Sequence, residues 1–155
     1  MYMTHSYTKI FVHLVWSTKD RRRLVTNQLR PQLFHHFIEY CRLNNIYIDS
    51  LGIQPEHVHV LINLRSDQKV DDVVKLMKGE SSHWINCENL IRPKFSWQRG
   101  YGAFSVSMSH LDAVRTYIRN QDEHHRKRSL MEEVQAILTK HGFNIADMPA
   151  EKPTE

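Results

Sequence analysis

The chain lacks the features that mark several large classes of protein. It has no run of about 18 apolar residues, so no segment is long and apolar enough to span a membrane as a helix. The opening residues, MYMTHSYTKI, do not place a charged head before a long apolar run, so we expect no signal peptide. The only two cysteines, Cys41 and Cys87, lie far apart and show neither metal-site nor redox spacing, which favours a reduced, cytoplasmic setting.

What the chain does have is the composition of one folded domain. Its 155 residues are the length of an ordinary domain, and 41% of them are hydrophobic, which is enough for a core. The formal net charge is only +4, but the positive residues are clustered. Clustered lysine and arginine attract phosphate chains, although solvated loop charge is the alternative explanation for any one cluster. The three clusters are Lys19 with Arg21, Arg22 and Arg23; Arg92, Lys94 and Arg99; and Arg126, Lys127 and Arg128.

The hydrophobic pattern predicts the elements of the first half of the chain. Residues 7–18 alternate with a period of two, which is typical of a strand. A helix follows, capped by Thr26 and reaching about Asn44, because its apolar residues recur at helical spacing. Two further strands are predicted over residues 46–53 and 57–64, joined by a short turn.

The second half is predicted to add a helix, a strand and two more helices. Ser109, followed three residues later by Asp112, has the capping-box pattern of a helix start. The predicted elements are, in order, a helix over Val70–Cys87, a strand over 103–109, a helix over 111–121 and a helix over about Ser129–His141 that ends at Gly142.

This order of elements indicates the fold class. The order β-α-β-β-α-β followed by extra helices is the split βαβ, or ferredoxin-like, arrangement. We therefore expect an α+β protein with a four-stranded antiparallel sheet, helices on one face of it, and additional C-terminal helices. The other face of the sheet is expected to be open for function. Residues 1–142 are expected to form a single domain, with 143–155 as a flexible tail.

Two histidines interrupt an apolar strand in the stretch IQPEHVHVLINL. Because strand side chains alternate between faces, Val58 and Val60 point to the core while His57 and His59 point to the open face. Residues two apart on a strand are about 6–7 Å apart at Cα, which suits two imidazoles that converge on one divalent ion. The alternative is a pair of surface histidines in a chain that contains 11 of them.

A tyrosine and a glutamine share the packed face of a later helix. Tyr117 and Gln121 are separated by four residues, so they are neighbours on the helix surface together with Val114 and Ile118. The tyrosine alone is explained by a packed aromatic that anchors the helix. A buried glutamine needs polar partners, and one of them can be a metal held by the two histidines.

Several motifs together resemble one known family. The segments PEHVHVLI, SWQRGYGAFSVS and YIRNQDEHH occur in the order and spacing of the single-tyrosine HUH transposases of small prokaryotic insertion sequences, which include repeat-associated relatives. HUH stands for His-hydrophobe-His, here His57-Val58-His59, and the opening FVHLVWSTKDRRRL is also similar. The resemblance covers about residues 5–128, and the combination of motifs is more specific than any one of them.

The resemblance implies a function and a set of roles. Tyr117 would be the nucleophile on the helices after the sheet, and His57, His59 and Gln121 would hold Mg²⁺ or Mn²⁺. The substrate would be single-stranded DNA, often a hairpin near the end of a mobile element, cut and rejoined through a 5′-phosphotyrosine intermediate in transposition or DNA recombination. The family also implies a homodimer with composite active sites.

Other residues are weaker candidates. His13 lies on the open face of the first strand, where it either contacts the metal ligands or DNA, or is simply a packed or solvent-facing histidine. Trp97, Tyr101 and Phe104 accompany basic residues, although core packing is the simpler explanation for the first and last of them. The residues expected to contact DNA are Lys9, Lys19, Arg21, Arg22, Arg23, Arg99 and Arg126.

Two other functions remain open from the sequence. The first is a module that binds single-stranded nucleic acid without catalysis, as some ferredoxin-like sheets do. The second is a metal-dependent phosphodiesterase that uses water as its nucleophile. Cleavage that survives the loss of Tyr117 would indicate the second, and chelator-insensitive binding without cleavage would indicate the first.

Overall fold

A computed structural model describes residues 4–122, 128–144 and 146. The chain divides into two units, Met1–Gln121 and Asp122–Glu155. The single domain expected over residues 1–142 stays a prediction, and most of the expected tail lies outside the described residues.

The first unit is built on one four-stranded sheet. The strands are ordered β2-β3-β1-β4, and each neighbouring pair is antiparallel. This arrangement confirms the ferredoxin-like prediction, because the two central strands are β1 and β3 and the hairpin partner β2 lies at one edge. The strand bounds are β1 Phe11–Ser17, β2 Tyr47–Ile53, β3 His57–Asn63 and β4 Gly102–Val106.

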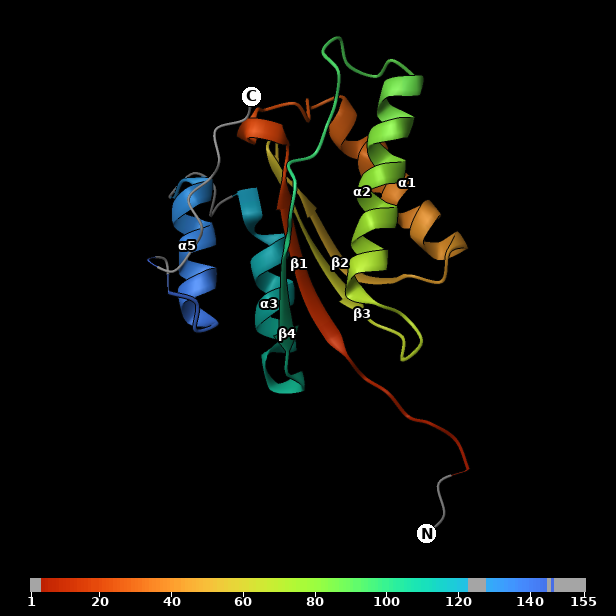
Figure 1. The fold of residues 1–155 in the computed structure, drawn as a ribbon, viewed down its shortest axis with the longest axis vertical. Coiled ribbons are helices and arrows are strands. Elements are labelled where there is room, and N and C mark those ends of the chain that lie inside the picture. The colour runs from red at the N-terminus through yellow and green to blue at the C-terminus, as the bar shows by residue number, and fades with distance from the viewer. Residues whose placement is uncertain (1–3, 123–127, 145, 147–155) are drawn as a thin grey trace. The chain divides into compact units, whose positions relative to one another are not determined.

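Two helices cover one face of this sheet. Helix α1 spans Leu29–Leu43 and helix α2 spans Val70–Cys87, and Figure 1 shows both on the same side of the strands. The bounds of α2 match the prediction. The hydroxyl oxygen of Thr26 accepts a hydrogen bond from the Leu29 amide at 3.1 Å, which supports the start of α1. The main core lies between these helices and the inward residues of the sheet, among them Leu14, Trp16, Val58, Val60, Leu33, Phe37, Val74 and Met77.

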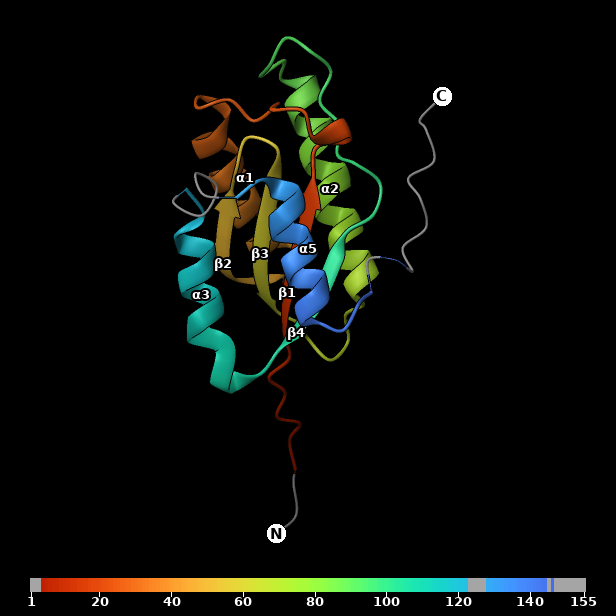
Figure 2. The same ribbon diagram turned by 90° about the vertical axis from the view of Figure 1, so that its left-hand side faces the viewer.

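A third helix packs on the opposite face. Helix α3 spans Leu111–Arg119, and its Leu111 and Ile118 form a second apolar cluster with Phe11 and Leu61 of the sheet. Figures 1 and 2 show α3 on the side of the sheet away from α1 and α2. The face of the sheet that was predicted to be open is therefore partly covered by α3, the helix that carries Tyr117.

The predicted start of α3 is wrong in detail. A 3-10 turn, Met108–His110, precedes the helix, so Ser109 lies inside a helical turn and does not cap one. Its hydroxyl contacts the Ser107 hydroxyl at 3.0 Å and the His110 ring at 3.2 Å instead of a backbone amide. A capping side chain needs an extended backbone, and a residue within a 3-10 turn does not have one.

The second unit contains helix α5, Leu130–Lys140. Ser129 and Glu132 form a reciprocal capping box at its start. Gly142 has a φ of +82° and its amide donates to the Thr139 carbonyl at 3.1 Å, so the helix ends as predicted. None of the helices in the described residues is both long and apolar enough to cross a membrane.

Candidate active site

Strand β3 brings the two histidines of the HUH motif to the α3 face of the sheet. His57 and His59 are both completely buried. Their rings lie 5.0 Å apart between centroids, and one ring nitrogen of each lies within 4.8 Å of the other. The intervening Val58 belongs to the main core beneath α1 and α2, so the predicted alternation of faces is confirmed.

Each of these imidazoles is oriented by a neighbouring polar side chain. The Nδ1 atom of His57 lies 3.1 Å from a carboxylate oxygen of Glu56. The Nδ1 atom of His59 lies 2.8 Å from Nε2 of His13, which reaches it from β1. A ring nitrogen held in this way fixes the direction in which the other nitrogen points. The sequence predicted His13 on this face and left open a contact with the metal ligands, and it gave no role to Glu56.

Gln121 and Tyr117 lie against the same two rings. Gln121 is 1% exposed, and its amide oxygen is 3.4 Å from Nε2 of His57. Its amide nitrogen donates to the Tyr117 carbonyl at 3.3 Å, so the orientation of the amide is set by this second contact. The phenol ring of Tyr117 is half-buried and lies edge-on to His59, with 5.5 Å between ring centroids. One chain thus brings together the four residues singled out from the sequence.

The position of α3 depends on a close approach to β2. Gly52 pairs with His59 across the sheet, and a Cβ atom at Gly52 would lie 2.9 Å from the carbonyl oxygen of Ile118. Arg115 of α3 also makes a two-pronged ion pair with Asp49 of β2, at 2.9 and 2.7 Å. This hydrogen-bonded guanidinium lowers the pKa of the Asp49 carboxyl. The missing side chain of Gly52 lets α3, the helix of Tyr117, approach the sheet that carries the histidines, and the ion pair between Asp49 and Arg115 stabilises this position.

Most of the predicted DNA-contacting residues gather at one end of the site. The loop after β1 and the loop before β4 are joined, because the Lys19 amide donates to Ser96 and the Asp20 amide donates to the Gln98 side chain. Arg99 is exposed and directly follows Gln98, so it lies in the loop that is joined to the first basic cluster. Ser17, the last residue of β1, pairs with His57, so this basic region lies at the end of the sheet where the histidine motif begins. Its exposed members are Lys19, Arg21, Arg22, Arg23 and Arg99.

Lys78 of α2 secures the second of these loops. Its ammonium group donates to the carbonyls of Gln98 and Gly100 at 2.7 and 2.8 Å, and burial lowers its pKa. The sequence did not single out Lys78, because it lies beside the apolar stripe of its helix like any surface lysine and its carbonyl partners are 20 and 22 residues away. A loop held at several points keeps the Arg99 side chain close to the other cations.

The other two predicted contacts lie elsewhere. Lys9 is exposed near the opposite end of β1, with its ammonium group 5.9 Å from the centroid of the Phe11 ring. Arg126 lies outside the described residues. The predicted set is therefore not one continuous group around His57.

The aromatic residues Trp97 and Tyr101 of the second loop and Phe104 of β4 divide as expected. Phe104 is 5% exposed, and Trp97 packs against the main core while its indole nitrogen donates to Ser81 at 2.9 Å. Core packing is confirmed for both. Tyr101 is exposed in the loop before β4, two residues after Arg99.

The chain is similar to known proteins of one kind. The family model described as IS200-like transposases matches residues 6–121. The ISDra2 transposase TnpA of Deinococcus radiodurans is 23% identical over 116 residues, which cover 72% of this chain and 83% of that protein. A solved Deinococcus radiodurans transposase has a TM-score of 0.62 at 24% identity, covering 78% of this chain and 98% of its own. A REP-associated tyrosine transposase bound to a REP hairpin has a TM-score of 0.59 at 19% identity, covering 81% and 74%.

The fold and these matches define the protein as a transposase, which is a DNA-cleaving and strand-transferring enzyme. The matched residues span the whole sheet, helices α1 to α3 and both halves of the candidate site. The chain belongs to the IS200-like transposase family, so the family resemblance of its motifs is confirmed.

Proposed function

We propose that this transposase cuts and rejoins single-stranded DNA with Tyr117 as its nucleophile. One observation carries the proposal: the Tyr117 ring and the Gln121 amide meet the two histidines of the HUH motif, at 5.5 Å from the His59 ring and 3.4 Å from His57 Nε2. A phenol beside two imidazoles and an amide oxygen suits attack on a phosphate held by a divalent ion. Simple packing of the tyrosine would not require these polar neighbours.

The residues fit a divalent ion held by His57, His59 and Gln121. When the His57 Nδ1–H donates to Glu56, the Nε2 lone pair and the Gln121 oxygen are two acceptors that face each other at 3.4 Å. Two acceptors repel unless a proton or a cation lies between them, so this donor set favours a cation. Imidazole and amide oxygen ligands suit several divalent metals, and the family resemblance favours Mg²⁺ or Mn²⁺.

The reaction balances without a further co-reactant. A bound divalent ion would withdraw charge from the scissile phosphate and favour the phenolate. The Tyr117 hydroxyl oxygen forms a bond to phosphorus, the bond from phosphorus to the 3′-oxygen breaks, and the phenol proton passes to the departing 3′-oxygen, which becomes a 3′-hydroxyl. The product is a 5′-phosphotyrosine that conserves the phosphoester bond. A second 3′-hydroxyl reverses the step and joins a new strand.

The substrate proposed is a DNA strand with a hairpin. The similar REP-associated transposase was solved with a REP hairpin. In this chain the exposed cations Arg21, Arg22, Arg23 and Arg99 lie at the end of the sheet where His57 begins β3, which suits a phosphate chain that leads into the site.

A covalent adduct tests the proposed nucleophile. The protein is incubated with Mn²⁺ and a labelled single-stranded oligonucleotide that carries the hairpin flanking its own coding sequence, and the products are resolved on a denaturing gel. We expect an adduct that Tyr117→Phe abolishes and Tyr40→Phe preserves, since Tyr40 lies on α1 in the opposite layer. Cleavage without an adduct that survives Tyr117→Phe would instead identify water as the nucleophile.

The expected homodimer with composite sites stays a prediction. In the structure one chain supplies Tyr117 and both histidines. Mixing Tyr117→Phe with a His57→Ala, His59→Ala double variant decides between the two arrangements. Restored adduct formation in the mixture requires a tyrosine from one chain and histidines from another, whereas no restoration assigns all three residues to one chain.

A further inference from the structure

Glu56 is a buried carboxylate that the proposed reaction does not use. Its side chain is 6% exposed, although glutamate is among the residues that are rarely buried without a partner. One carboxylate oxygen lies 3.1 Å from Nδ1 of His57, and the other lies 3.6 Å from the guanidinium of Arg23. A buried charge in such a position calls for a function or for compensation by its neighbours.

The backbone around Glu56 is held tightly. The Thr18 amide and hydroxyl both donate to the Glu56 carbonyl, at 2.8 and 3.2 Å, and Thr18 has no exposed surface. The Gln54 amide donates to the His57 carbonyl at 2.8 Å across the turn. The carboxylate therefore has a fixed position relative to the ring that follows it, which is the condition for orienting that ring.

A carboxylate has a specific effect on an imidazole. An ionised carboxylate only accepts hydrogen bonds, so the contact with Nδ1 requires the proton of His57 to lie on Nδ1. The Nε2 lone pair then faces the Gln121 amide oxygen, 3.4 Å away. The opposite tautomer would place a proton on Nε2 and remove the lone pair that a metal needs.

We infer that Glu56 is a positioning residue that fixes the tautomer and direction of His57 for metal binding. The inference rests on the proposed metal site. Arg23, whose side chain is 68% exposed, offsets the charge of Glu56 and connects it to the loop after β1. Outer partners of this kind typically change metal affinity by about tenfold to a hundredfold when they are removed.

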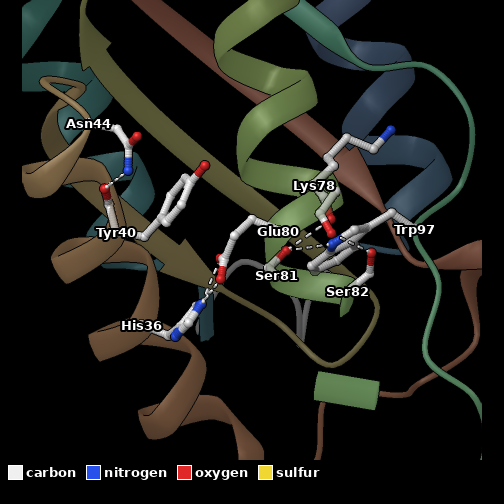
Figure 3. A network of polar contacts seen from close by, with 9 residues as sticks. His36, Tyr40, Asn44, Lys78, Glu80, Ser81, Ser82 and Trp97 are labelled. Atoms are coloured by element: carbon white, nitrogen blue, oxygen red, sulfur yellow. Dashed lines mark hydrogen bonds and ion pairs between the residues drawn. The ribbon is translucent and has the colours of Figure 1, made fainter. Parts of the chain in front are cut away.

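The test compares two glutamates that each contact a histidine. Glu80 of α2 lies 2.6 and 2.8 Å from Nε2 of His36, on the helical layer away from the site, and Figure 3 shows this pair bridging α1 and α2. Mn²⁺ affinity is measured by the electron paramagnetic resonance signal of the free ion. We expect Glu56→Gln to weaken binding at least about tenfold, since its amide nitrogen can donate to Nδ1 and favour the wrong tautomer, and Glu80→Gln to match the wild type.

Ring ¹⁵N shifts of His57 in the metal-free protein provide a second readout. We expect the wild type to carry its proton on Nδ1 and Glu56→Gln to lose this preference. A wild-type proton on Nε2 would overturn the inference without any variant, even if Glu56→Gln fails to fold. Equal Mn²⁺ affinity for wild type and Glu56→Gln would also overturn it and leave the metal site intact. A wild type that binds no Mn²⁺ would overturn the proposed metal site, while the ring shifts still decide the role of Glu56.

Discussion

Replacing Gly52 by alanine should move Tyr117 and Gln121 away from the two histidines of β3. Gly52 lies on β2 next to His59, directly beneath α3. The added methyl carbon would be 2.9 Å from the Ile118 carbonyl oxygen and 3.2 Å from the Ile118 methyl group. Because the oxygen belongs to the backbone, it cannot turn aside as a flexible side chain would, and α3 has to move as a whole.

The magnitude follows from the contact distance. A carbon and a carbonyl oxygen pack at about 3.3–3.6 Å, so α3 must retreat by roughly 0.5 Å. Overpacking of this kind destabilises a protein by about 1–3 kcal/mol. The same movement widens the 3.4 Å separation between His57 and Gln121. A misplacement of about 1 Å can lower a rate about a hundredfold, so we expect an adduct yield reduced by the order of tenfold.

Gly79→Ala is a matched control for this substitution. Gly79 is exposed within α2, and apart from its chain neighbours and the adjacent backbone of its own helix, no heavy atom in the described part of the chain would lie within 4 Å of its added Cβ. Alanine in a helix interior is favoured over glycine by about 0.5–1 kcal/mol, so this variant should be more stable than the wild type and equally active. Urea denaturation and the adduct assay measure both variants. Wild-type stability and adduct yield for Gly52→Ala would show that α3 does not dock on β2 as described.

Three further substitutions or reagents test other parts of the structure. Asp49→Asn should lower the free energy of unfolding at pH 7, because Arg115 holds the pKa of the Asp49 carboxyl below its ordinary 3.8. The wild-type advantage is present above about pH 4 and lost as the pH falls through the lowered value, so an equal difference at pH 7 and pH 2 by urea denaturation would contradict it. Burial raises the pKa of the Cys41 thiol to about 12, so a thiol reagent at pH 8 should label exposed Cys87 quickly and Cys41 only on unfolding; rapid labelling of both would refute the burial. Ser129→Ala should destabilise α5 by about 1 kcal/mol, seen as faster amide hydrogen exchange in that helix, and unchanged exchange would argue against the cap.

Much of the fold could be predicted because its signals are local. The alternation through His57 and Val58 assigns each side chain to a face without reference to any other strand. The apolar stripe of Val70–Cys87 likewise defines a helix from its own residues. Ser109 shows the limit of a local signal. Its sequence matches a capping pattern, but the residue lies within a 3-10 turn and so lacks the extended backbone that a capping residue needs.

The contacts that orient the site could not be predicted in the same way. His13 meets His59 only because β1 and β3 pair in a particular register, which no local pattern specifies. Asp49 and Arg115 are 66 residues apart and meet only after α3 docks on β2. Glu56 directly precedes His57, but adjacent strand residues normally point apart, so their contact depends on the turn that starts the strand.

The proposed metal site has no carboxylate among its direct ligands, and this determines the charge that a bound ion would keep. The proposed ligands, His57, His59 and Gln121, are all neutral, so a bound ion would keep its full positive charge for a phosphate. A carboxylate as direct ligand would offset part of that charge. Glu56 instead acts indirectly. One of its oxygens contacts Nδ1 of His57, the ring nitrogen that would not bind the metal, and its other oxygen lies next to the guanidinium of Arg23. Under the proposed assignment, the chain gains the orienting effect of a carboxylate while leaving the ion electrophilic.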